Sequence, residues 1–184
     1  VRREQFLRPQ GTGEWPDGTV AGRYSFQHAL YQEVLYERLP AMRRQRLHGQ
    51  LGKREEQGYG EQAREIAAEL AVHFERGRDH RKAIRYLQQA GENALRRSAN
   101  MEAISLLTKG LELLKTLPDT HERTQQELTL YIALGGPLIA TKGYAALEVE
   151  TIYARARELC QQVGETPQLV PALGGLWQFY MNRA

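Results

Sequence analysis

The sequence has few cysteines, and it lacks long apolar runs and a signal peptide. It contains one cysteine, Cys160, in 184 residues, so no disulfide can form within the chain. No apolar run approaches the roughly 18 residues of a membrane helix, and no signal-peptide pattern stands at the N-terminus. We therefore expect a cytoplasmic protein with no membrane contact. Cys160 falls on an apolar helical stripe, which predicts a buried free thiol.

The sequence also lacks the residue spacings of common catalytic and metal sites. In GGPLIATKG the lysine, Lys142, precedes the last glycine, so this is not the phosphate loop G-x-x-x-x-G-K-[ST]. Neither Ser98 nor Ser105 stands in a G-x-S-x-G elbow. The five histidines form no H-x-x-x-H pair, and a single cysteine leaves too few ligands for a zinc motif. We predict a chain that is not an enzyme and has no metal site or cofactor of its own.

The charge is unevenly distributed along the chain. Residues 1–60 hold 10 Lys and Arg against 7 Asp and Glu, whereas residues 61–184 hold 15 against 15. This small excess disfavours a dedicated nucleic-acid binder. Five basic residues nevertheless cluster in one segment: Arg43, Arg44, Arg46, Lys53 and Arg54. They leave an alternative function open, in which the N-terminal module contacts DNA and binding disappears when Arg43, Arg44 and Arg46 become alanine.

The first 60 residues predict a small module. In WPDG, Pro16 and Asp17 form the centre of a turn between two strands, at residues 5–9 and 22–26. A helix follows and ends at Pro40, and a second, basic helix runs to the glycines at 58 and 60. We expect a hairpin and two helices to form a small module over residues 1–60, with the next domain spanning residues 61–184.

From residue 61 the sequence repeats one helical pattern. Apolar residues step by three and four in predicted helices at 61–76, 80–97 and 101–117, and the last two match at an offset of 20 residues. Gly91 and Gly110 both lie on the packing face, which predicts close approach of neighbouring helices, and Gly77 suits a left-handed helix end. Short helices that share such a stripe predict an all-α fold of stacked helical repeats, a solenoid.

Three more helices complete the predicted repeats. The fourth contains Pro137, which should kink or interrupt it, and the fifth covers residues 147–163. The sixth follows Pro167 and carries an apolar stripe of Leu169, Val170, Leu173, Leu176, Trp177 and Tyr180. The chain begins without methionine and stops within this pattern, so we expect a fragment truncated at its C-terminus. The last helix should expose apolar residues and favour self-association.

These residues resemble a known family. The run ELAVHFERGRDHRKAIRYLQQAGENALRRSANMEAISLLTKGLELLKTLPDTHER, with the later LGGPLIATKGYAALEVETIYARARELC, is similar to the tetratricopeptide-like region of bacterial STAND-class AAA-type signalling ATPases, which often carry class III adenylate or guanylate cyclase domains. The upstream GRYSFQHALYQEVLYERLPAMRRQRLH resembles the end of the winged helix that precedes those repeats. The resemblance covers about residues 20–184. It implies a regulatory region that holds an ATPase inactive or receives a protein partner.

The resemblance also implies roles for particular residues. The parent would bind ATP or ADP with Mg²⁺, and SFQHAL places His28 where related ATPases sense the diphosphate of ADP. The alternative is that His28 only caps or packs at a strand-to-helix junction. For partner binding we single out residues that should lie off the packing stripe of one helix: Arg85, Tyr86, Gln89 and Arg96. Whether the parent is a cyclase, an ATPase or a transcriptional regulator stays open.

Overall fold

The computed structural model describes residues 6–164 and 167–183. These residues are mostly helical, with a two-stranded antiparallel sheet near the N-terminus. The chain divides into two compact units, Val1–Asp79 and His80–Ala184. The sequence suggested a boundary after residue 60 instead. The helix at residues 67–76 packs against the helix before it, so it belongs to the N-terminal unit.

The sheet is a hairpin with one irregularity. Strand β1 (Leu7–Glu14) pairs with β2 (Val20–Phe26) from the Leu7–Phe26 pair to the Glu14–Val20 pair. Between Pro9 and Thr12 the register shifts, so that two residues of β1 oppose one of β2, and Gly11 there has φ 90°. The predicted turn is confirmed, because the Gly18 N–H donates to the Trp15 carbonyl at 2.8 Å. The part of the predicted first strand at Gln5 lies outside the described residues.

After the hairpin, the part of the N-terminal unit that the structure describes contains three α-helices and a 3₁₀ turn: α1 (Ala29–Glu37), α2 (Ala41–Tyr59), η2 (Gly60–Arg64) and α3 (Ala67–Arg76). Helix α2 buries Gly52, Glu55 and Gly58, and no large apolar side chain. A Cβ on Gly52 would lie 3.3 Å from the Phe74 ring of α3. Helices α2 and α3 therefore meet over small and polar groups instead of a leucine stripe.

The hairpin tip is held against α2 by a set of polar and aromatic contacts. Arg54 donates to Asp17 at 2.7 Å, and its guanidinium lies 4.5 Å from the centre of the Trp15 ring. A Cβ on Gly58 would lie 2.6 Å from Trp15. The arginine, the tryptophan and the glycine therefore fit one another as a unit, which explains how a short hairpin keeps its position on a polar helix.

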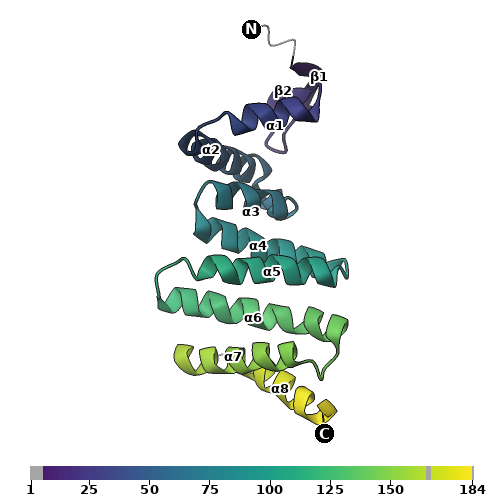
Figure 1. Ribbon diagram of the computed structural model, residues 1–184, viewed down its shortest axis with the longest axis vertical. Coiled ribbons are helices and arrows are strands. Elements are labelled where there is room, and N and C mark those ends of the chain that lie inside the picture. The colour runs from purple at the N-terminus through teal and green to yellow at the C-terminus, as the bar shows by residue number, and fades with distance from the viewer. Residues whose placement is uncertain (1–5, 165–166, 184) are drawn as a thin grey trace. The chain divides into compact units, whose positions relative to one another are not determined.

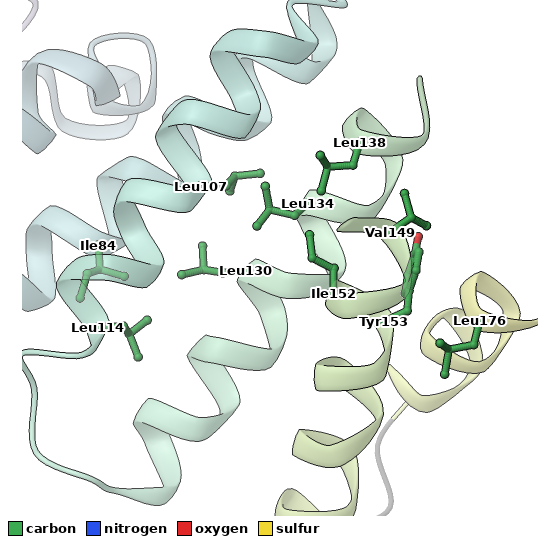
Figure 2. Close-up of a cluster of buried hydrophobic side chains, with 10 residues drawn as sticks. All are labelled: Ile84, Leu107, Leu114, Leu130, Leu134, Leu138, Val149, Ile152, Tyr153 and Leu176. Carbon is green, nitrogen blue, oxygen red and sulfur yellow. The ribbon is translucent and has the colours of Figure 1, made fainter. Parts of the chain in front are cut away.

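The described residues of the C-terminal unit form five helices: α4 (His80–Arg96), α5 (Asn100–Leu114), α6 (His121–Lys142), α7 (Leu147–Val163) and α8 (Leu169–Arg183). Each helix packs against the next along the chain, so α4 to α7 lie side by side in sequence order and α8 covers α7 (Figure 1). One cluster of buried side chains runs through all five helices (Figure 2): Ile84, Leu107, Leu114, Leu130, Leu134, Leu138, Val149, Ile152, Tyr153 and Leu176.

Most of the predicted apolar faces are buried. Ala83, Leu87 and Ala94 of α4 are almost fully enclosed, as are Ala103 and Leu107 at the matched positions of α5. The predicted close approach is confirmed at Gly91, where a Cβ would lie 2.9 Å from the Leu107 side chain, whereas at Gly110 the nearest atom would be 3.4 Å away. Cys160 is a buried free thiol, as predicted. None of the helices in the described parts of the chain is long and apolar enough to cross a membrane.

Three details of the prediction are wrong. The helix expected at 61–76 is split into η2 and α3. Pro137 does not interrupt α6, because a proline removes one backbone donor while the turns on either side keep theirs. Gly77 has φ −76°, and the left-handed residue is Arg78, with φ 61°. In α8 the buried residues are Ala172, Gly175, Leu176 and Phe179, and of these only Leu176 belongs to the predicted stripe.

Candidate functional site

The proposed nucleotide sensor, His28, occupies the strand-to-helix junction. It is the N-cap residue of α1, with an extended backbone (φ −139°, ψ 140°), and its side chain makes no capping hydrogen bond. The ring is exposed and meets Tyr31 edge to face, with 5.8 Å between ring centres. The imidazole is therefore accessible to a ligand, and the capping alternative receives no support from its hydrogen bonds.

The four residues chosen for partner binding have different environments. Arg85 and Arg96 are exposed, as expected. The expectation that these residues lie off the packing stripe is wrong for Tyr86, which is 3% exposed because it lies on the packing side of α4. Arg85 covers its ring at 4.8 Å and donates to its hydroxyl at 3.2 Å. Gln89 is half-buried, and its Oε1 is a buried oxygen without a hydrogen-bond partner.

A basic groove lies beside Arg85. It is formed by the first turns of α4, the segment at 117–120 and the start of α6, and these residues line it: Arg81, Lys82, Arg85, Leu117, Pro118, Thr120, Glu122, Arg123 and Gln126. Four of these side chains are basic and one is acidic. Arg81 forms an exposed ion pair with Glu122 at 3.5 Å, and Arg123 pairs with Asp119 at 3.2 Å and with Glu127 at 3.8 Å, so part of the positive charge is already balanced. The arrangement suits an acidic segment.

The basic cluster on α2 is only partly free. Arg54 is engaged with Asp17 and Trp15, and Arg44 lies 5.3 Å from the centre of the Tyr36 ring. The other three, Arg43, Arg46 and Lys53, line a second groove on α2 and form no ion pair within the described part of the chain. This groove is where the N-terminal unit could contact phosphates.

Helix α8 presents a broad apolar surface. Its outward side chains and their exposed fractions are Val170 76%, Leu173 46%, Trp177 63%, Tyr180 57% and Met181 62%. The predicted exposure of apolar residues on this helix is therefore confirmed. The helix has two adjacent apolar faces, one packed on α7 and one open.

A polar network links α1, α2 and α3. The Tyr36 hydroxyl lies 2.9 Å from Nε2 of His48, and Nδ1 of His48 lies 2.9 Å from Nδ1 of His73. On the other side of the His73 ring, Nε2 lies 3.6 Å from Oε1 of Glu55. Glu69 is one helical turn before His73 on α3, and ligand atoms of Glu55, Glu69 and His73 all lie within 4.8 Å of one another. These five side chains form a continuous group of titratable residues.

Burial changes the protonation of this network. Burial, followed by the nearby Glu69 carboxylate, raises the pKa of Glu55 to about 7. Burial also lowers the pKa values of His48 and His73. Both effects favour neutral forms of groups that would otherwise carry charge in a poorly solvated place.

Sequence reasoning missed this network. The search for H-x-x-x-H pairs passed over Glu69-x-x-x-His73, which places two ligands on one helical face in the same way. Glu55 and His48 could not be joined to them, because the contact depends on how α2 packs on α3. The spacing on α3 was the one signal available.

Comparisons with known proteins give one relative. The chain matches no protein-family model, and no solved structure matches it. It is 31% identical over 162 residues to an uncharacterised protein of Rhizobium meliloti (strain 1021), an alignment that covers 86% of this chain and 16% of that protein. The chain therefore spans about a sixth of the length of the curated relative it matches.

Proposed function

We propose that the chain is a non-catalytic scaffold of tetratricopeptide-like helical repeats that binds a protein partner or another domain of its own parent protein. The observation that carries this proposal is the packing order of α4 to α8, in which each helix contacts its neighbours along the chain. The 20-residue offset of the sequence also appears in the backbone. Arg78 and Ser98 are both left-handed, and the Asp79 N–H bonds the Phe74 carbonyl as the Ala99 N–H bonds the Ala94 carbonyl.

The proposed parent is a STAND-class signalling ATPase that binds ATP or ADP with Mg²⁺ and is linked to an adenylate cyclase in some members of that class. The resemblance of the motifs is the basis of this assignment, and the much greater length of the Rhizobium relative is compatible with it. In this arrangement the hairpin and α1 are the end of the winged helix. The exposed His28 then faces the nucleotide of the preceding ATPase domain.

The basic groove beside Arg85 is the proposed recognition surface. It would take an acidic segment of a partner protein or of the parent's own ATPase domain. Arg85→Glu should weaken that association, whereas Arg96→Glu should not, because Arg96 is exposed on the same helix and does not line the groove. Calorimetry of the two variants against the ATPase domain would compare them directly.

The decisive experiment uses a form of the protein extended upstream of Val1. ATP and ADP binding is measured by calorimetry on the chain itself and on the extended form, each with His28→Ala and, as a matched control, His121→Ala. We expect binding only by the extended form, with His28→Ala weakening ADP more than ATP. If the extended form binds no nucleotide, or if both histidine variants behave alike, the nucleotide-linked role is rejected.

Self-association through α8 is the second part of this proposal. Trp177 is 63% exposed beside other apolar side chains, and such a surface favours contact with a second copy. Sedimentation over a range of concentrations should detect dimers that Trp177→Lys abolishes. Met101→Lys is the control, because Met101 is also exposed but lies on α5. A monomer at all concentrations would exclude this contact.

The alternative is nucleic-acid contact through the groove on α2. It is favoured by the three basic side chains that line this groove, Arg43, Arg46 and Lys53. Fluorescence anisotropy with duplex DNA would then show binding that weakens steeply with salt and disappears when Arg43, Arg44 and Arg46 are changed to alanine. If DNA binding is absent or does not depend on salt, the nucleic-acid alternative is rejected and the scaffold function is retained.

A further inference from the structure

We infer that Glu55, Glu69 and His73 form a binding site for a divalent transition-metal ion of the zinc type, which fastens α2 to α3. Two carboxylates and one imidazole are a ligand set that such ions accept, with water or a partner's side chain completing the coordination. The inference is independent of the scaffold function. It concerns three side chains that the N-terminal unit brings together by its own packing.

The first support is an unpartnered carboxylate oxygen. Glu55 is 8% exposed, and its Oε2 is buried without a hydrogen-bond partner. A buried carboxylate oxygen in that condition is costly, because water no longer solvates it and nothing replaces the water. Glu69 and His73 contribute the other ligand atoms of the same group. A cation bound by both oxygens of the Glu55 carboxylate would supply the missing partner of Oε2 while Oε1 faces His73.

The second support is the separation of Glu55 and His73. Their facing atoms, Oε1 and Nε2, are 3.6 Å apart, which is too long for a hydrogen bond whichever tautomer His73 adopts. Two ligands at 2.0–2.1 Å from a tetrahedral zinc ion lie about 3.4 Å apart. The observed spacing therefore fits two ligands of one metal better than it fits a donor and an acceptor.

The third support is the orientation of the His73 ring. Its Nδ1 is occupied by His48, and His48 is in turn bonded to the Tyr36 hydroxyl. If His73 donates through Nδ1, its Nε2 carries the lone pair that faces Glu55. Metal-bound histidines are commonly oriented in this way by a hydrogen bond on the second nitrogen. Glu69 is exposed, so an ion can enter from its side.

Zinc binding can be measured on the untagged 184-residue chain after treatment with a chelator. Calorimetry with Zn²⁺ should give one site per chain, and Co²⁺ should give visible absorption bands from bound metal. Glu69→Gln should weaken binding by about 100-fold or more, since even outer-shell ligand partners contribute about 10- to 100-fold. Glu65→Gln, an exposed neighbour outside the cluster, should leave the affinity unchanged.

A second variant separates this site from adventitious binding by surface histidines. His73→Gln should abolish the Co²⁺ bands, with circular dichroism confirming that the helices remain folded, whereas His121→Ala should retain them. Mg²⁺ and Ca²⁺ should not compete, because both prefer all-oxygen ligands. Binding that is absent, or that survives in both Glu69→Gln and His73→Gln, would overturn the inference.

Discussion

Helix α1 and helix α5 carry similar apolar patterns but use them differently. In α1 no residue is buried, and Leu30, Val34 and Leu35 are 64%, 37% and 41% exposed. In α5, Leu107 and Leu114 are almost fully enclosed between α4 and α6. The comparison shows that helical spacing alone does not bury a face. A helix of this kind is stabilised when it has a neighbour on each side, which α5 has.

The largest expected effect on stability comes from comparing leucine-to-alanine substitutions in the two kinds of helix. Leu130→Ala, at a residue with 0% exposure in the cluster of Figure 2, should lower the free energy of unfolding by about 2–5 kcal/mol. Leu30→Ala removes the same atoms from α1 and should change it by less than about 0.5 kcal/mol. Thermal and urea unfolding followed by circular dichroism measures both. Equal losses would mean that the face of α1 is covered in solution.

The next test uses two adjacent glycines of α8. A Cβ on Gly175 would overlap the Tyr153 ring, whereas one on Gly174 would meet nothing within 4 Å. Gly175→Ala should therefore cost about 1–3 kcal/mol through overpacking. Gly174→Ala should stabilise the helix by up to about 1 kcal/mol, because alanine favours helix. Denaturant midpoints of the two variants decide this, and a stabilising Gly175→Ala would show that α8 does not pack tightly on α7.

A smaller effect compares the two units at matched backbone positions. Arg78 and Ser98 both have positive φ, near 60°, where a side chain costs roughly 1–2 kcal/mol. Arg78→Gly and Ser98→Gly should each stabilise by about 0.5–1 kcal/mol, after the entropy cost of glycine. Ser105→Gly, in the interior of α5, should destabilise by a similar amount. Unequal gains at 78 and 98 would show that the two helix ends are not equivalent.

Much of the fold was predictable because it follows from the spacing of apolar residues along each helix. The limits of α7 at residues 147–163 and the buried positions of α4 follow from steps of three and four residues. The left-handed position after α3 was misassigned to Gly77, because glycine usually fills it. Gly77 is needed instead for close approach, since a Cβ there would lie 3.0 Å from the Gly49 backbone. A contact between segments 28 residues apart overrode the local preference.

The candidate sites were less predictable, because they depend on contacts between helices. Tyr86 was expected to face a partner, yet it is buried. Arg54 was grouped with free basic residues, but it is bound by Asp17 of the hairpin, 37 positions earlier. The groove beside Arg85 joins side chains from three separate segments. Residue spacing along one helix cannot predict such groupings.

The last prediction concerns a difference in pH dependence between one carboxylate of each unit, measured with a chelator present. Glu55 faces Glu69 and His73, and its pKa is raised from its ordinary value of 4.5 to about 7, so the folded state binds more protons than the unfolded state between these two pH values. Its contribution to stability therefore falls as pH rises through this range. The contribution of Glu148 to stability has the opposite pH dependence. Its hydrogen bond with Lys142 lowers its pKa, so the contribution is lost as pH falls below 4.5.

The free energy of unfolding of Glu55→Gln should accordingly rise relative to that of the unmodified chain as pH rises from 4.5 to 7. Glu148→Gln should be less stable than the unmodified chain above pH 4.5, and this difference should shrink as pH falls below 4.5. The lowered pKa values of His48 and His73 add stability as pH rises toward 6.5, but this contribution is shared by the variant and the unmodified chain and largely cancels in their difference. Unfolding midpoints at half-unit pH steps measure the two differences. If the unfolding midpoints of Glu55→Gln and the unmodified chain change with pH in parallel, Glu55 is solvated and ionised in the folded protein. The packing of α2 on α3 would then be looser than that of α4 on α5.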